Sequence, residues 1–396
     1  MRTGSIFLIA CLFLSSLSCN GKQTPSQHPE AVVETAVPEF PQTVSFDTGI
    51  ETEQEILLSQ IADKVEYIPL ETNTECLLQH LRGNVQFAGG NFIIPCSKAV
   101  YMFDGTGKYI RRIGRSGGGP GEYNRVHSID IDWKDSLIYL YTIGKQIVYS
   151  FRGDFIRSTT VPDVNKIAYL NNNIFAAYIY NSTGQEKNRI LLLNPKGETV
   201  KTFPYYDRFT IKKGVSMNMM GENDRYLFHY KDNLCFKDYY NDTLFTVTEK
   251  ELQPRYIIRL GKFAIPVEKR WENMNFDMQR FKREASSYLR VNVIETDHYL
   301  FMPYGHWAGD EKGGLMLYDK NKKTCFNVPG GLIKNDIDGG IPLDPYTSVD
   351  DNTLLTLWTP ADIMELAEKN PDILKNEKLK NMKEDDNHVL MIVHLK

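Results

Sequence analysis

The sequence predicts an all-β protein, a six-bladed β-propeller with short helical insertions. A strand–turn–strand pattern at residues 101–113 returns at 148–157 and 191–200, and its central glycines are 46 and then 44 residues apart. A period of roughly 40 to 50 residues built from strands is typical of a propeller, where each repeat is one four-stranded blade. A second observation is the pair of terminal strands at 64–71 and 388–395. Pairing these strands in one blade would close the ring and remove two unpaired strand edges.

The other five blades follow the strand at 64–71 along the chain. Strand and turn signals place them at about 77–114, 123–162, 163–206, 211–262 and 288–328. The turns between their outer strands fall near Gly107, Gly153, Gly197, Glu249 and Asn321. Glycine adopts the positive φ that a tight hairpin requires. The last two turns lack glycine, so we expect looser hairpins there.

Two segments interrupt the strand pattern and predict helices. In residues 266–290 the apolar side chains recur at spacings of three and four, at Trp271, Met274, Met278, Phe281 and Ala285. The second segment begins at 359–362 (Thr-Pro-Ala-Asp), with a capping residue and proline at the first helical position, and 370–372 (Asn-Pro-Asp) repeats this signal. We expect both insertions to lie against blade loops as structural covers, with partner binding as the alternative.

The amino terminus has the order of regions found in secretory signals. Arg2 precedes an apolar run at 6–14, which is too short to span a bilayer, and small residues lead to Cys19. The Leu-Ser-Cys ending resembles the lipobox of bacterial lipoproteins, in which the cysteine is lipidated and becomes the first mature residue. The predicted organisation is a lipoprotein signal peptide at 1–18, a flexible tether at 19–60 and the propeller at 61–396. The alternative is ordinary secretion with Cys19 incidental.

Composition and cysteine use narrow the function classes. The chain has 396 residues, 42% hydrophobic and 24% charged, as in ordinary globular proteins. Its net charge of −4 gives no basic face for nucleic acid, so that partner class is excluded. Four cysteines remain after the signal and Cys19, and their spacing matches no metal motif. Three disulfide pairings of these four are open, and we favour isolated buried thiols at Cys76, Cys96, Cys235 and Cys325.

A glycine-rich loop carries the clearest resemblance to a known family. Residues 112–123 end in Gly-Pro-Gly-Glu-Tyr and precede an inner strand at 128–132, which resembles an NHL-type propeller repeat. Together with the lipobox, residues 67–72, the Phe-Asp-x-x-Gly-Lys turn at 103–108 and the terminal strand, the chain resembles the six-bladed β-propeller lipoproteins of Bacteroidota-type bacteria over residues 60–396. The resemblance implies a cell-envelope protein, lipid-anchored at the outer membrane. The residues after Cys19 lack the acidic run that marks surface export in some relatives, which favours the periplasmic side.

Phosphate binding is a weaker interpretation of the same loop. Its glycines could cradle a phosphate, but the loop lacks the Gly-Lys-Ser/Thr ending and the following helix of a P-loop.

The mouth of the central channel is where inner strands and their loops converge, so candidate ligand-binding residues are taken from there. They are Tyr123, Arg125, His127, His229, Tyr304, His306, Trp307 and Trp358. Histidines from different blades could meet on the axis and bind zinc. No His-x-His or His-x-x-x-His spacing occurs, however, so we predict no metal and no cofactor, and a structural role for most histidines. Five further polar residues lie near predicted inner strands, where such residues usually cap turns: Asp130, Asp132, Asn218, Asn292 and Asp350.

The function predicted from these features is non-catalytic binding of a glycan, peptide or protein partner by a membrane-anchored envelope protein. Loops at 205–208, 239–242 and 304–310 place aromatic side chains beside Asn, Asp, Arg or His. Such loops suit sugar rings and peptides, because the ring supplies apolar area while its neighbours fix orientation. The alternative is a metal-dependent propeller enzyme of the lactonase or lyase type with its site at the channel. A purely structural role in the envelope is a third hypothesis.

Overall fold

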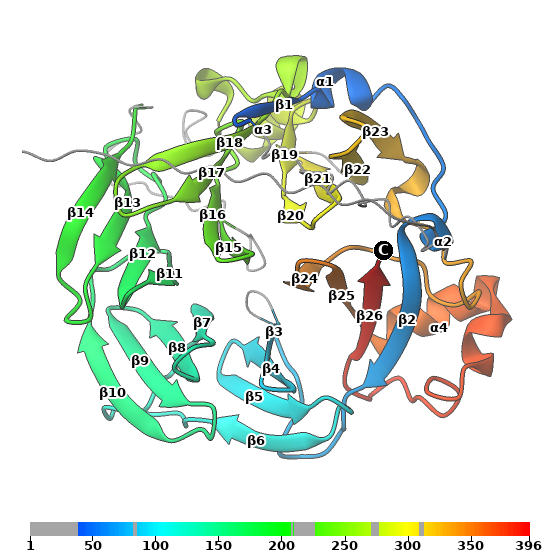
Figure 1. The fold of residues 1–396 in the computed structure, drawn as a ribbon, viewed down its shortest axis with the longest axis horizontal. Coiled ribbons are helices and arrows are strands. Elements are labelled where there is room, and N and C mark those ends of the chain that lie inside the picture. Colours follow the sequence, from blue (N-terminus) through cyan, green and yellow to red (C-terminus); the bar gives the residue numbers. More distant parts are fainter. Residues whose placement is uncertain (1–38, 82–84, 207–208, 210–225, 271–276, 309–312) are drawn as a thin grey trace, which may run out of the picture. The chain divides into compact units, whose positions relative to one another are not determined.

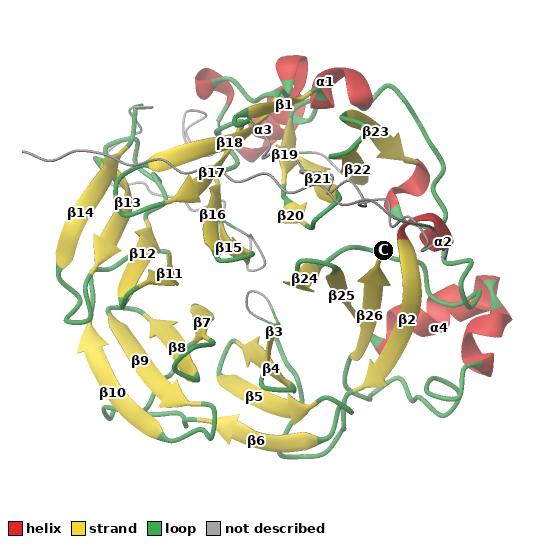
Figure 2. Ribbon diagram, viewed as in Figure 1, coloured by secondary structure: helices red, strands yellow, loops and turns green. Residues whose placement is uncertain are grey.

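Six β-sheets are arranged around a central axis (Figure 1). The computed structural model describes residues 39–81, 85–206, 209, 226–270, 277–308 and 313–396. Strands form the ring and the few helices lie at its rim (Figure 2). The six-bladed β-propeller predicted from the repeat is confirmed. The signal peptide and Cys19 lie outside the described residues.

Each blade is an antiparallel meander whose first strand is nearest the axis. The first three blades are β3 (Gln86–Ala88), β4 (Asn91–Cys96), β5 (Ala99–Asp104) and β6 (Tyr109–Ile113); β7 (Ser128–Asp132), β8 (Leu137–Thr142), β9 (Lys145–Ser150) and β10 (Phe155–Thr160); and β11 (Lys166–Asn171), β12 (Ile174–Tyr178), β13 (Asn188–Leu193) and β14 (Thr199–Pro204). The fourth and fifth blades are β15 (Leu227–Tyr230), β16 (Asn233–Lys237), β17 (Thr243–Val247) and β18 (Leu252–Ile258); and β19 (Leu289–Val291) with β20 (Ile294–Glu295), β21 (Tyr299–His306), β22 (Gly314–Asp319) and β23 (Thr324–Val328). All five lie within the ranges expected from the sequence.

The sixth blade joins the two ends of the chain. It contains β24 (Thr347–Asp350), β25 (Thr353–Trp358), β26 (Val389–Leu395) and, as its outermost strand, β2 (Ala62–Pro69). Strand β2 pairs antiparallel with β26 along its length, from Ala62 opposite Leu395 to Pro69 opposite Val389. The predicted closure is therefore confirmed, and the sheet hydrogen bonds of this blade hold the ring shut.

The outer hairpin turns use two different devices. Gly107, Gly153 and Gly197 have φ of 88°, 82° and 79°, as expected for tight turns. In the fourth blade, the Thr248 hydroxyl accepts hydrogen bonds from the backbone N–H groups of Lys250 and Glu251 instead. In the fifth, the Asp319 carboxylate accepts from the N–H groups that follow it. Asp104, Ser150 and Asn194 accept backbone N–H groups in the same way in the first three blades, so all five turns share the polar cap and only the first three add glycine.

Residues 40–61, here called the belt, correct the expected extent of the tether. They begin with β1 (Gln42–Val44), which adds to blade 4 as a fifth strand parallel to β18. The one-turn helices α1 (Phe46–Gly49) and α2 (Leu58–Ile61) follow along blades 5 and 6 (Figure 1). Phe46 and Leu58 are fully buried. Burial of these apolar side chains offsets the entropy cost of ordering the segment, so the tether cannot extend to residue 60.

The described parts of both predicted insertions contain helices. Helix α3 (Met278–Ala285) is capped by Asp277 and buries Phe281 and Ala285, whereas residues 271–276 lie outside the described part. Short 3-10 turns precede it at Gly261–Phe263 and Val267–Lys269. Helix α4 (Pro360–Lys369) begins at the Thr359 cap, and a 3-10 turn at Pro371–Lys375 begins at Asn370, as the capping signals predict. A further 3-10 turn lies at Pro329–Gly331. No helix among the described residues is long and apolar enough to cross a membrane.

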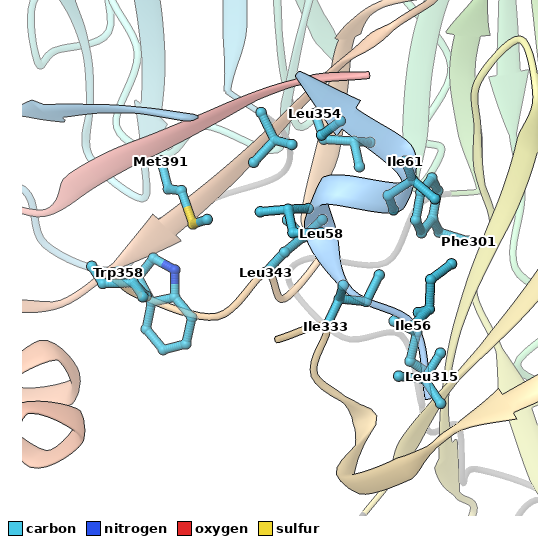
Figure 3. Close-up of a cluster of buried hydrophobic side chains, with 14 of the residues drawn as sticks. Ile56, Leu58, Ile61, Phe301, Leu315, Ile333, Leu343, Leu354, Trp358 and Met391 are labelled. Carbon is cyan, nitrogen blue, oxygen red and sulfur yellow. The ribbon is translucent and has the colours of Figure 1, made fainter. Parts of the chain in front are cut away.

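The largest core cluster lies between blades 5 and 6 and includes the belt (Figure 3). Ile56, Leu58 and Ile61 of the belt pack with Phe301 and Leu315 of blade 5 and with strands of blade 6. The belt is therefore part of the propeller core.

The four cysteines of the propeller are free thiols, as expected. Burial raises the pKa of Cys96 to about 11 and that of Cys235 to about 12, which keeps both thiols protonated and unreactive near neutral pH.

Candidate functional site

A cavity of about 450 Å³ lies along the axis of the propeller. Innermost strands of five blades line it, because the first strand of each meander faces the channel. Its polar and charged lining residues are Gln86, Ser128, Asp130, Lys166, His229, Lys231, Thr347, Ser348, Asp350 and Asp351. The volume falls in the range of small-molecule sites, which is about 300–1,000 Å³.

A hydrogen bond between Asp130 and His229 joins the inner strands of blades 2 and 4. The Asp130 Oδ2 and His229 Nε2 atoms are 3.0 Å apart, although one residue lies on β7 of blade 2 and the other on β15 of blade 4. The Asp130 carboxylate also accepts hydrogen bonds from the backbone N–H of Ile131 at 2.9 Å and of Tyr169 at 2.6 Å. The Asp130 residue is only 5% exposed. Its contacts come from strands of three blades, and these contacts fix the position of the carboxylate. The His229 side chain is 36% exposed.

Asp130 also controls the charge of His229. Burial alone would lower the pKa of the imidazole, but the charge of Asp130 and its hydrogen bond outweigh this, and the pKa of His229 is raised above 6.5. A protonated histidine therefore persists to higher pH here than in an exposed position.

The turns at the ends of the inner strands form an ion-pair network at one mouth of the channel. Lys231 Nζ lies 2.9 Å from Asp297 Oδ1, which also accepts a hydrogen bond from the Tyr230 hydroxyl. Asp351 accepts from the backbone N–H of Lys231 at 3.0 Å, and Asp350 from that of Asn352 at 2.9 Å. The ammonium group of Lys231 is thus already paired with a carboxylate.

Trp133 lines the cavity where β7 ends, and 54% of its surface is exposed. Its ring contacts Phe151 edge to face, with centroids 6.4 Å apart. This contact supports one edge of the indole while much of the ring stays accessible. A flat exposed ring beside polar groups offers apolar area next to hydrogen-bonding partners.

Of the eight residues predicted at the channel mouth, the structure places only His229 in the cavity lining. Tyr123 is buried against blade 1, where its hydroxyl donates to the Ile113 carbonyl and accepts from the Val100 N–H. Arg125 is exposed, and the His127 ring contacts Tyr141 edge to face. Neither Arg125 nor His127 lines the cavity.

The four candidates on later blades lie in other packing environments. The Tyr304 hydroxyl donates to Asn327, and the Nδ1 atom of His306 lies within hydrogen-bonding distance of the Ser286 carbonyl. Trp307 is buried, donates to the Leu289 carbonyl and stacks on Tyr240 with the ring planes 7° apart. Trp358 belongs to the core cluster of blades 5 and 6 (Figure 3). These side chains contact other elements of the propeller and do not line the axial cavity.

Several lining residues were not among the sequence candidates. Trp133, Lys166, Lys231 and Asp351 lie at strand ends or in turns, where polar and aromatic residues are common and carry no distinctive signal. Asp130 was expected to cap a turn. The position of Asp130 in the strand Ser128–Asp132 could have indicated its neighbours, because alternate residues of a strand face the same way.

The glycine-rich loop at residues 112–123 makes hydrogen bonds within itself and with Lys145 of blade 2. The Glu122 carboxylate accepts from the Gly119 N–H and pairs with Arg115, and Lys145 donates to the carbonyls of Gly119 and Glu122. The loop therefore serves as a blade connection. Within the described ranges, no group of three or more His, Cys, Asp or Glu residues could hold a metal ion.

The comparisons with known proteins agree with this fold. Residues 41–394 match the family described as "Domain of unknown function (DUF4934)". The chain belongs to this family. Its match begins at the belt, in agreement with the corrected boundary of the folded region. No curated protein matches the chain.

Two solved structures of Bacteroides proteins are similar to it. One, a "putative exported protein" from Bacteroides fragilis, has a TM-score of 0.70 and 17% identity and covers 90% of this chain and 100% of its own. Another, a member of the DUF4221 family from Bacteroides vulgatus, has a TM-score of 0.50 and 11% identity over 85% of this chain and 97% of its own. At these identities the likeness concerns the fold alone. Neither comparison names an NHL repeat, so that finer label stays a prediction.

Proposed function

We propose that this DUF4934 protein is an exported, lipid-anchored envelope protein that binds a glycan in its central channel without catalysing a reaction. The observation that carries the proposal is the axial cavity of about 450 Å³, lined by polar side chains from five blades and by the half-exposed Trp133. A cavity of this size and polarity favours a small hydrophilic ligand over a protein surface. Hydroxyl-rich sugars match a lining of Ser, Thr, Gln, Asp and Lys, while the indole supplies apolar area for one ring face.

The enzymatic alternative has less support. A metal-dependent lactonase or lyase would need several His, Cys, Asp or Glu ligands in one place. In the described part of the chain, no such group is found. We therefore favour binding of a glycan over catalysis.

Substituting Trp133 by alanine should weaken glycan binding at least tenfold, because the stacking surface at the cavity is lost. The mature protein would first be screened against an oligosaccharide panel, and the affinity for the best ligand then measured by calorimetry. The matched control is Tyr206→Ala, which removes an aromatic ring that is 83% exposed and does not line the cavity. If no oligosaccharide binds, or if both variants bind like the wild type, channel binding of glycans is wrong.

Substituting Cys19 by alanine should release the protein from the membrane fraction into the soluble envelope fraction. Two or three acyl chains anchor a protein firmly, since each buried CH₂ contributes about 0.8 kcal/mol. The measurement is fractionation of cells, with metabolic labelling by a fatty acid. Cys76→Ala is the control, because this thiol is buried in the propeller. Equal membrane association of the wild type and the Cys19 variant would contradict the anchor.

A further inference from the structure

We infer that the central channel binds a linear oligosaccharide lengthwise, with about three sugar units between Trp133 at one end and Gln86 at the other. This inference rests on the proposed function and specifies the shape and length of its ligand. The residues that line the cavity lie at different depths along the axis, and these depths set the length that a ligand can span.

The inner strands of five blades surround the centre of the ring (Figure 1). They run in the same direction along the axis, since four antiparallel strands return the chain to the same side before the next blade begins. Their first residues form one level of the cavity: Gln86, Ser128, Lys166, Leu227 and Thr347. Asp130 and His229, each the third residue of its strand, form a middle level. The residues at the far strand ends or in the turns that follow form the last level: Trp133, Lys231, Asp350 and Asp351.

Two contacts between blades show that equal positions in different strands lie at equal depth. At the middle level, the Asp130 Oδ2 and His229 Nε2 atoms are 3.0 Å apart. At the last level, the Asp351 carboxylate accepts a hydrogen bond from the backbone N–H of Lys231 at 3.0 Å. Both of these residues lie four positions after the first residue of their strands. The number of residues along a strand therefore measures depth in the cavity.

The cavity is longer than it is wide. Asp351 follows Thr347 by four residues on β24, and the same spacing separates the first and last levels on β15. A strand rises about 3.3 Å per residue, so these levels lie roughly 13 Å apart. Over this length, a volume of about 450 Å³ corresponds to a mean cross-section of roughly 35 Å², a circle about 7 Å across. Such a space accepts a chain of rings more readily than one globular ligand.

The length of the cavity matches a short oligosaccharide. One hexose unit of an extended chain is about 5 Å long, which is the rise of roughly one and a half strand residues. A single ring can therefore contact one end of the cavity only, whereas about three rings reach from Trp133 to Gln86. At the middle level, the joined side chains of Asp130 and His229 take up part of the channel, so the remaining space suits an unbranched chain.

The two ends of the cavity offer different contacts. Trp133 is 54% exposed and presents the area of its ring. Gln86 is partly buried as the first residue of β3 and carries an amide that can donate and accept hydrogen bonds. Each end can therefore be altered without changing the other.

The test measures how affinity depends on oligosaccharide length. Cello-, malto-, manno- and xylo-oligosaccharides of one to six units are titrated into the mature protein in a calorimeter. In the series that binds, affinity should rise about a hundredfold from one unit to three, because each ring adds its own contacts. From four units to six it should change less than about twofold, because the added rings lie outside the cavity.

Two variants locate the ends of the ligand. A trisaccharide should lose about tenfold in affinity in Trp133→Ala and about fivefold in Gln86→Ala, and the losses should multiply in the double variant because the two sites are far apart. A monosaccharide should respond to only one of the two substitutions. Tyr206→Ala and Gln253→Ala are the matched controls, since both side chains are exposed and neither lines the cavity.

The outcomes separate the two proposals. A monosaccharide that binds as tightly as the trisaccharide, or an affinity that keeps rising through six units, would overturn the lengthwise binding and leave glycan binding in place. The same conclusion follows if Gln86→Ala unfolds in urea like the wild type and binds the trisaccharide unchanged. If no oligosaccharide of any length binds, the proposed function is wrong, and the inferred ligand length is wrong with it.

Discussion

Replacing Phe46 by alanine should lower the free energy of unfolding by about 3 to 5 kcal/mol, as for other buried phenylalanines. Phe46 lies in the belt, is fully buried and contacts Tyr304 edge to face at 5.7 Å. Its cluster also contains Val44, Tyr256 and Ile258, so truncation leaves a cavity between the belt and blades 4 and 5. The measurement is the denaturation midpoint in urea, with the slope checked for constancy.

Ile143→Ala serves as the control for this prediction. Ile143 lies in the turn between β8 and β9 and is largely exposed, so its loss should change stability by less than about 0.5 kcal/mol. Equal midpoints for Phe46→Ala and the wild type would show that the belt does not pack on the propeller in solution.

Replacing Glu295 by glutamine should also destabilise the protein by about 3 to 5 kcal/mol, because it leaves buried cations without their counter-charge. Glu295 is fully buried on β20, and its Oε1 atom accepts from Arg255 at 2.6 Å and from Lys320 Nζ at 2.8 Å. Glutamine keeps the shape of the side chain and removes only the charge. Thermal and urea unfolding at neutral pH would measure the loss.

The matched comparison is Glu365→Gln, which removes a carboxylate paired with Lys369 on the exposed face of α4. An exposed pair one helical turn apart contributes little, so this variant should unfold like the wild type. A loss below about 1 kcal/mol in Glu295→Gln would mean that solvent reaches the pair, contrary to the burial on which the expectation depends.

The blades were predictable because their signals are local. Each hairpin is specified by its own alternating strands and turn residue, as at Gly107, Gly153 and Gly197, and the regular spacing of these turns indicates the ring. The belt was not predictable in this way. Its strand has three residues and its helices have one turn each, so their stability depends on partners more than 200 residues away in blades 4 and 5.

The contacts of the candidate site also join residues that are far apart in the sequence, so they could not be predicted from local patterns. His229 was a candidate because it lies in the fourth blade near the predicted channel mouth, but its partner Asp130 lies 99 residues earlier and no sequence pattern joins the two. Trp307 was a candidate because of the composition of its loop. An indole beside glycine and histidine has the composition of a binding loop, yet in the fold its N–H reaches a backbone carbonyl and its ring stacks on Tyr240.

The pairing of β2 with β26 determines when the molecule can become stable. A chain crosses a membrane or leaves the ribosome in sequence order, so residues 62–69 emerge first and their sheet partner at 389–395 emerges last. Until then β2 lacks the strand with which it pairs. The ring can therefore close only after nearly the whole chain has been made, and loss of residues 389–395 would leave β2 and β25 without the strand that lies between them.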